Sequence, residues 1–271
     1  MPTLPSRYWQ ELTTEDFAAL DPETTVAVMP VAAIEQHGPH LPVYVDACLN
    51  KGVMDRAIDL MPDDLGALVL PMLAVGKSDE HINFPGTLTL SNETLQKMWF
   101  EVGASVARVG VRKLVIYNSH GGQRQHTEII ARELRLAHEM FVVAVNPSSF
   151  GRPEGLFPPG ELRHGIHAGS VETSMMLHLR PDLVHMNRAA DFRPDTYDVE
   201  ENYEILRAIG PVSFGWKAQD MQVDGVCGNA LDADAERGEK VVDFMAGKLV
   251  TLIGEVADYP LSNVRGPDWR D

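Results

Sequence analysis

The chain has few cysteines, few aromatic residues and few positive charges. Its 271 residues include two cysteines, 7% aromatic residues, and 23 Lys and Arg against 39 Asp and Glu. A scaffold held by disulfides needs more cysteines than this, so we expect Cys48 and Cys227 to be free, buried thiols. A hydrophobic content of 44% is enough for the core of one large domain.

The shortage of positive charge also limits which partners the chain can bind. A formal net charge of -16 repels a phosphate backbone, and no cluster of Lys and Arg offers a basic groove for nucleic acid. No segment reaches the roughly 18 apolar residues of a membrane span, and residues 1–11 lack the charged and then apolar layout of a signal peptide. We therefore expect a cytoplasmic protein with neither a nucleic-acid nor a membrane partner.

Short apolar runs alternate along the chain with segments of helical periodicity. The apolar runs cover residues 26–33, 67–73, 113–118 and 141–146. The helical patterns cover residues 46–61, 92–109, 123–138, 171–179 and 235–256, and Ser91 is the expected N-cap of the second. No repeat or linker divides the chain. The alternation predicts an α/β fold: a single domain over residues 1–271, with a largely parallel β-sheet and helices on both faces.

A carboxylate and an imidazole follow the first predicted strand, two residues apart. Glu35 and His37 would point the same way on an extended segment, because side chains at i and i+2 share a face. Pro39 and Pro42 stiffen the next turn, and Asp46 follows it as a third potential ligand. Imidazole together with carboxylate oxygens suits zinc, manganese or iron better than calcium.

Two further turns carry similar side chains. His120 follows the predicted strand at 113–118, and ligands of open α/β sheets collect at such strand ends. Glu172 lies near the start of the predicted helix at 171–179, where a carboxylate can also simply stabilise the helix dipole. Each residue alone has an ordinary structural explanation. Together, the three glycine-punctuated turns favour a metal site.

These turns resemble the motifs of the creatinine amidohydrolase (creatininase) family. The main matches are Glu-Gln-His-Gly-Pro-His-Leu-Pro at 35–42, Asn-Ser-His-Gly-Gly at 118–122 and His-Ala-Gly-Ser-Val-Glu-Thr-Ser at 167–174. Weaker matches are His-Ile-Asn-Phe-Pro-Gly-Thr at 81–87 and a glycine-rich turn with a helix start at 225–239. The resemblance implies a creatininase-like fold and a hydrolase that acts on carbon–nitrogen bonds.

The resemblance also implies two divalent metal ions per chain, of zinc, manganese or iron. The metal ligands that it implies are Glu35, His37, Asp46, His120 and Glu172. Asp46 would bridge the two ions, with a water or hydroxide between them. One ligand departs from the family, because creatininase has a glutamate where this chain has Gly122. Glu172 is the expected substitute and is also expected to be a catalytic carboxylate.

A hydroxide formed on the metal ions would attack the amide carbonyl, and the departing nitrogen would then need a proton. His167 matches the family's catalytic histidine and is expected to supply it. The expected substrate-binding positions are Ser78, the backbone of Gly121 and Arg163.

Arg163 bears on the identity of the substrate. It stands where creatininase has a tryptophan over the creatinine ring, so creatinine is a poor candidate. An arginine offers a planar fork of donors to carboxylate or phosphate, which favours a small, anionic amide. We expect hydrolysis of a non-peptide C–N bond in a cyclic amide or a formamide. The alternative is a metallopeptidase like the one that trims the mycofactocin precursor.

Two stretches lack clear periodicity. Residues 146–165, with four prolines and four glycines, are expected to be irregular and to form either a wall or lid of the substrate pocket or a surface excursion. Residues 188–215 are also expected to be irregular and to pack against a neighbouring subunit. Family members are commonly hexamers, so the resemblance implies a homo-hexamer.

Two other classes of protein fit the sequence less well. A nucleotide-binding enzyme is disfavoured because no Gly-x-Gly-x-x-Gly or Walker loop follows a predicted strand. A non-catalytic, metal-free binding protein on the same fold is conceivable because of Gly122. Metal analysis separates the metal-dependent hydrolase from the metal-free binding protein, since a hydrolase of this kind holds about two ions per chain and the binding protein holds none.

Overall fold

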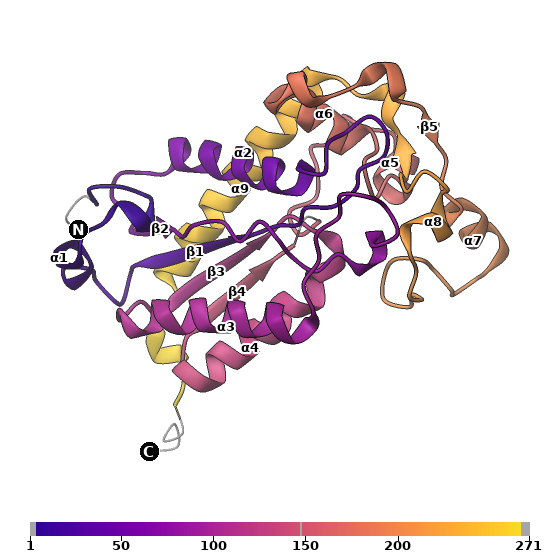
Figure 1. The fold of residues 1–271 in the computed structure, drawn as a ribbon. Helices are drawn as coiled ribbons and strands as arrows, with labels where there is room; N and C mark the ends of the chain where they lie inside the picture. The colour runs from indigo at the N-terminus through magenta and orange to yellow at the C-terminus, as the bar shows by residue number, and fades with distance from the viewer. Residues whose placement is uncertain (1–3, 147, 267–271) are drawn as a thin grey trace.

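Four parallel strands form the central sheet of the structure, a computed structural model that describes residues 4–146 and 148–266 (Figure 1). In order across the sheet, the strands are β2 (Ala67–Val69), β1 (Val26–Val31), β3 (Lys113–Asn118) and β4 (Phe141–Val145). The three pairings between them are all parallel, and Val31 lies opposite Asn118. Because β1 and β3 are neighbours and end level with each other, the residues that follow them meet at one edge of the sheet.

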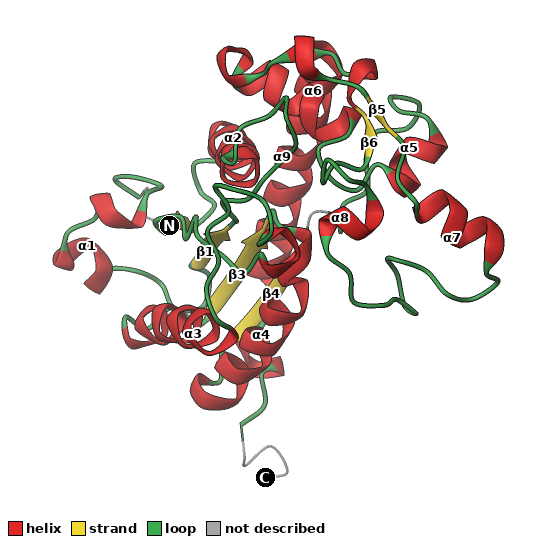
Figure 2. Ribbon diagram, turned by 45° about the vertical axis from the view of Figure 1, so that its right-hand side comes forward, coloured by secondary structure: helices red, strands yellow, loops and turns green. Residues whose placement is uncertain are grey.

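Helices cover both faces of this sheet (Figures 1 and 2). One face is covered by α2 (Val45–Leu60) and α9 (Ala235–Asp258), against which α6 (Ser170–Leu179) packs, and the other by α3 (Asn92–Arg108) and α4 (Arg124–His138). Side chains alternate along β1, so Val28 joins the first core and Met29 the second. The predicted α/β class, with a largely parallel sheet between helices, is confirmed.

Shorter elements complete the described chain. They are the helices α1 (Thr14–Ala18), α5 (Pro159–His164), α7 (Thr196–Asn202) and α8 (Ala218–Met221), and the antiparallel pair β5 (Asp191–Phe192) and β6 (Gly228–Asn229). The 3-10 turns are η1 (Trp9–Glu11), η2 (Asp79–His81), η3 (Gly121–Gln123), η4 (Pro181–Leu183), η5 (Met186–Arg188), η6 (Ala230–Asp232) and η7 (Leu261–Asn263). Helices α5, α7 and α8 lie on the side toward which the strands point (Figure 2).

Most predicted boundaries agree with the structure to within two residues, and β2 is the exception. It stops at Val69 instead of continuing to residue 73. Pro30 of β1 has no backbone N–H to donate toward this stretch, so the ladder is interrupted there, although the amide of Leu73 still donates to the carbonyl of Pro30 at 3.0 Å. Ser91 is confirmed as the N-cap of α3, since its side chain accepts from the amide of Thr94.

The two stretches expected to be irregular both contain regular elements. The first ends in α5, and the second contains β5 and α7. Thr196 is the one buried residue of α7, so this short helix leaves almost no apolar periodicity in the sequence. Cys48 and Cys227 are free and buried, as expected. Within the described residues, no helix is long and apolar enough to cross a membrane.

Candidate metal centre

The five predicted metal ligands gather beyond the carboxyl ends of β1 and β3. They are Glu35, His37, Asp46, His120 and Glu172. The first four are buried, with at most 3% of their surface exposed, and the Glu172 side chain is 25% exposed. Gathering so many ionisable groups away from water is costly unless they pair with one another or with a metal ion.

Asp46 lies between two imidazoles. Its Oδ1 is 3.6 Å from Nε2 of His37, and its Oδ2 is 3.1 Å from Nδ1 of His120. Glu172 Oε2 lies 3.8 Å from the same Nε2 of His37. On the other side, Glu35 Oε2 lies 3.2 Å from Nδ1 of His120. Two three-residue groups therefore share Asp46, one with His37 and Glu172 and the other with Glu35 and His120.

Backbone carbonyls fix the tautomers of both imidazoles. Nδ1 of His37 is 3.0 Å from the carbonyl oxygen of Glu35, and Nε2 of His120 is 2.9 Å from that of Lys77. A carbonyl oxygen can only accept, so these two nitrogens donate. The remaining nitrogens, Nε2 of His37 and Nδ1 of His120, keep their lone pairs and face Asp46. Second partners of this kind are usual for histidines that bind metals.

Hydrogen bonds also fix the turn after β3. Asn118 accepts from the amide of His120 at 2.9 Å and donates to its carbonyl at 2.7 Å. Gln123 donates to the same Asn118 side chain at 2.9 Å. These contacts explain why the Asn-Ser-His-Gly-Gly sequence places His120 in one orientation.

The carboxylates occupy the first turns of two helices. Asp46 lies in the first turn of α2 and Glu172 in that of α6, where the helix dipole favours a negative charge. Glu172 Oε2 also accepts from the amide of Ala168 at 2.7 Å. Ala168 has a φ of 55°, a left-handed conformation that is uncommon for alanine. Such a backbone is often found at functional sites, and here it directs the Ala168 amide at a ligand.

The donor set fits a divalent metal ion. Among the described residues, Nε2 of His37 and Oδ2 of Asp46 are buried atoms without a hydrogen-bond partner. Leaving such an atom unpaired costs about 1–3 kcal/mol. Two lone pairs also face each other across the 3.1 Å between Asp46 and His120, an arrangement that needs a proton or a metal ion between them. Imidazole nitrogens and carboxylate oxygens together suit zinc, manganese or iron.

Protons occupy these positions when no metal ion does. Burial lowers the pKa of His37, but Asp46, Glu172 and Glu35 together outweigh burial and raise that pKa to about 9. Burial likewise lowers the pKa of His120, but Glu35 and Asp46 raise it well above its usual value. Metal binding must therefore displace protons, so we expect metal affinity to fall as the pH falls.

His167, the predicted catalytic histidine, lies beside the ligands. Its Nε2 is 2.7 Å from the carbonyl oxygen of Gln36 and therefore donates, which leaves the lone pair of Nδ1 3.6 Å from Glu35 Oε1. The ring stands 4.1 Å from that of His37 and 4.2 Å from that of His81, between centroids. Burial and these two neighbouring imidazoles lower the pKa of His167 well below its usual value. The ring is therefore neutral and able to accept a proton at Nδ1.

The structure adds three residues to the centre that the sequence did not predict as metal ligands, catalytic groups or substrate contacts. Nε2 of His81 lies 3.5 Å from Glu35 Oε1, and the side chain of Gln36 lies 2.7 Å from Nδ1 of His81. Glu80 Oε1 lies 3.2 Å from Nε2 of His120. The signal available for two of them was the Glu-His pair just before the matched Phe-Pro-Gly-Thr, a pair of the kind already noted at residues 35–37.

The expected substrate-binding residues have different surroundings. Ser78 is buried and donates its hydroxyl hydrogen to Glu35, whereas Gly121 begins η3 and is exposed. Arg163 lies on α5 and forms an ion pair with Glu200 of α7, with two N–O distances of 2.5 Å. The structure therefore joins Ser78 to the ligand cluster and Arg163 to another acidic residue. Their roles in substrate binding stay predictions, as does the role of His167.

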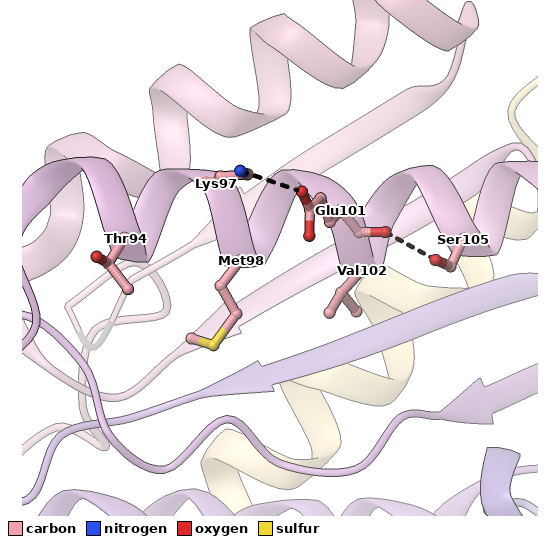
Figure 3. Close-up of a pocket in the computed structure, with 6 residues that line it drawn as sticks. All are labelled: Thr94, Lys97, Met98, Glu101, Val102 and Ser105. Atoms are coloured by element: carbon pink, nitrogen blue, oxygen red, sulfur yellow. Dashed lines mark hydrogen bonds and ion pairs between the residues drawn. The ribbon is translucent and has the colours of Figure 1, made fainter.

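A separate hollow lies along α3 (Figure 3). It is lined by Thr94, Lys97, Met98, Glu101, Val102 and Ser105. All six come from one helix. Its two charged residues, Lys97 and Glu101, form an ion pair with each other at 4.0 Å. None of the six belongs to the ligand cluster, so the hollow is not part of the metal centre.

Comparisons with known proteins agree with the geometry. The family model for creatininase, described as creatinine amidohydrolase, matches residues 10–253. The creatinine amidohydrolase of Pseudomonas putida is 31% identical over 246 residues, which cover 85% of this chain and 89% of that protein. The mycofactocin precursor peptide peptidase of Mycolicibacterium smegmatis is 32% identical over 218 residues, which cover 80% and 79%.

Solved structures give the same result. A crystal structure of creatinine amidohydrolase (creatininase) is 30% identical and has a TM-score of 0.75, covering 94% of this chain and 99% of that one. A mutant creatininase described as of the Zn-Zn type is 28% identical, with the same TM-score and the same coverage. The similarity therefore extends over nearly the whole chain, in sequence and in fold.

Proposed function

Because the chain belongs to the creatininase family, we propose that it hydrolyses a non-peptide C–N bond, in a cyclic amide or a formamide, with two divalent metal ions. Its relatives are amidohydrolases and peptidases, and the chain itself is a hydrolase of this family. One observation carries the proposal of two ions: Asp46 lies between the lone pairs of His37 and His120, and one of its buried oxygens has no partner.

The two groups around Asp46 would hold one ion each. His37, Asp46 and Glu172 form the first group, whose ligand atoms lie within 4.8 Å of one another. Glu35, Asp46 and His120 form the second. Zinc, manganese or iron suits these donors, and a solved relative is of a Zn-Zn type. When bound, such ions lower the pKa of water from about 15.7 to near 7 and polarise a carbonyl group.

The chain's own residues would handle the proton and keep the ligands in place. His167 is neutral and would take up a proton at Nδ1, then deliver it to the departing nitrogen. Ser78 holds Glu35, and the amide of Ala168 holds Glu172. Because these partners are in place before substrate arrives, little reorganisation is needed during the reaction.

Substrate choice is the finer part of the proposal. The chain is about as similar to a creatinine amidohydrolase as to a peptide peptidase, at 31% and 32% identity. A metallopeptidase of the mycofactocin-precursor type is therefore the second candidate. Arg163 is our proposed recognition residue for an anionic group, which would have to compete with Glu200 for the guanidinium. Ser78 and the backbone of Gly121 are the other proposed substrate contacts.

A panel of substrates tests the proposal. The protein loaded with zinc or manganese is assayed against lactams, formamides and short peptides, with and without a chelator. We expect turnover of a lactam or formamide that the chelator abolishes, and a loss of affinity for an anionic substrate in Arg163→Ala. Turnover of peptides alone would support the peptidase. Metal-free protein without turnover would point to a non-catalytic binding protein.

We also propose that residues 1–271 form one domain and that the chain assembles as a homo-hexamer. The two main cores lie on opposite faces of one sheet, which supports a single unit. Exposed apolar side chains gather within the 188–215 stretch, and they are Tyr203, Ile205, Leu206, Ile209 and Val212. Such a group is typical of a subunit contact. Light scattering after gel filtration measures the assembly, and the cytoplasmic location remains a prediction.

A further inference from the structure

Glu80 and Gly122 share one small space behind His120. Glu80 reaches this space from η2, and its Oε1 lies 3.2 Å from Nε2 of His120. A Cβ atom on Gly122 would lie 1.6 Å from that same oxygen and 2.7 Å from the same nitrogen. The backbone of Gly122 is not among the left-handed glycines of the described chain. Glycine is needed at this position for space, therefore, and not for its conformational freedom.

The carboxylate of Glu80 meets the ring of His120 at Nε2, the nitrogen that does not face Asp46. Nε2 of His120 has two acceptors, the carbonyl of Lys77 at 2.9 Å and Glu80 at 3.2 Å. Nδ1 of the same ring faces Asp46 and Glu35. The two ring nitrogens point in different directions. Glu80 therefore contacts the nitrogen of His120 that is not expected to bind the ion.

We propose that Glu80 is a positioning residue, which shares the Nε2 hydrogen of His120 with the carbonyl of Lys77 and so helps to keep the lone pair of Nδ1 toward the metal ion. The inference rests on the proposed function, because it requires His120 to be a ligand. A carboxylate in this position fixes the tautomer and the orientation of the ring and makes the other nitrogen a stronger donor. Gly122 is required for this contact, since any side chain at residue 122 would displace the carboxylate of Glu80.

Metal affinity is the readout that tests this role. Zinc affinity and stoichiometry are measured on the full chain by competition with a chromophoric chelator. We expect Glu80→Ala to weaken the binding of one of the two ions by about 10- to 100-fold. Glu80→Gln keeps an oxygen that can accept from Nε2, so this variant should retain most of the affinity for zinc. It also serves as the second variant if Glu80→Ala folds poorly. Glu128→Gln removes an exposed charge from α4 and should change nothing.

Gly122→Ala tests whether the space beside Glu80 matters. It keeps Glu80 but fills the space of its carboxylate, and its Cβ would also lie 2.7 Å from Nε2 of His120, so we expect a loss of affinity at least as large as that of Glu80→Ala. In the double variant Glu80→Ala/Gly122→Ala the two losses should not add, because both remove the same contact. Additive losses would contradict the proposal, as would equal losses in Glu80→Gln and Glu80→Ala.

The wild-type protein keeps this inference distinct from the proposed function. If the wild type binds two ions and Glu80→Ala binds two ions with the same affinity, the role of Glu80 is overturned and the proposed function is not. A wild type that binds no divalent ion would overturn the metal-dependent function, and the role of Glu80 with it.

Discussion

Glu161 and Asp46 are two buried carboxylates with opposite surroundings. Glu161 accepts from backbone amides with both oxygens, from Ser170 at 2.6 Å and from Asn229 at 3.0 Å. Asp46 faces imidazole nitrogens, and its Oδ2 has no hydrogen-bond partner. Burial is similar in the two, at 8% and 2% exposed. Burial alone therefore does not separate a structural carboxylate from a binding one.

The difference lies in the hydrogen-bond partners of the two carboxylates. Three glycines crowd Glu161, because a Cβ on Gly165, Gly169 or Gly228 would lie 2.2–2.6 Å from its Oε1. The glycines let three backbone segments close around one side chain, which joins α5, the start of α6 and β6. Nothing remains for Glu161 to bind. Asp46, in contrast, is left with an oxygen that only a proton or a cation can satisfy.

The largest expected effect comes from Asp46→Asn. The neutral amide is a poorer ligand for two cations, so we expect both ions to be lost and kcat/KM to fall by more than about 10⁴-fold, because the ions would no longer be there to activate water and polarise the carbonyl group. Metal content and turnover are measured on the same preparation, with circular dichroism to check the fold. Retention of two ions and of activity would remove the distinction drawn between Asp46 and Glu161.

A smaller loss is expected for His167→Gln. Without its proton carrier the enzyme should lose about 10²- to 10³-fold in kcat. The metal content should stay as in the wild type, because His167 is not among the proposed ligands. A variant with normal kcat would show that another group protonates the departing nitrogen, and His81, 4.2 Å away between ring centroids, would be the next residue to test.

Glu161→Ala should act on stability and leave the metal centre unchanged. It leaves two buried amides without an acceptor, so we expect the free energy of unfolding to fall by about 2–5 kcal/mol. Urea titration gives this value, and zinc affinity of the folded variant should stay within about threefold of wild type, an experimental margin of under 1 kcal/mol. Loss of metal with unchanged stability would reverse the roles given to the two carboxylates.

His40 offers a pH-dependent test of how burial affects an ionisable side chain outside the proposed ligand set. It is fully buried with its Nε2 3.0 Å from Thr173, and burial lowers its pKa to about 4. The unfolded chain binds this proton near pH 6.5, so the stabilising contribution is complete above pH 6.5 and is lost progressively as the pH falls from 6.5 to about 4. The loss amounts to about 3 kcal/mol.

Comparison with His40→Gln isolates this contribution. The free energy of unfolding of the metal-free variant should vary less between pH 6.5 and 4 than that of the metal-free wild type. Identical pH profiles would mean that His40 is not held neutral by burial.

The sequence was sufficient where the information is local. Apolar runs predicted the strands, and motifs at their carboxyl ends predicted that Glu35, His37 and His120 would meet, because parallel neighbours end at one edge. The sequence did not reveal Glu80 or His81 as part of the centre. Their approach depends on contacts between distant segments, such as that of the Lys77 amide with the side chain of Gln123 at 3.0 Å.

Arg163 illustrates the same limit for substrate recognition. Its position after a proline-rich stretch was visible, but its ion pair with Glu200 depends on α7, a helix with almost no apolar periodicity. Spacing along the chain shows which residues follow a strand. It does not show which side chain a surface arginine will meet.

Anomalous diffraction from crystals of the zinc-loaded protein tests the central claim most directly. We expect two peaks on either side of Asp46, each about 2.0–2.2 Å from its ligand atoms. One should lie among His37, Asp46 and Glu172, and the other among Glu35, Asp46 and His120. A map with no peak next to Asp46 would contradict the account.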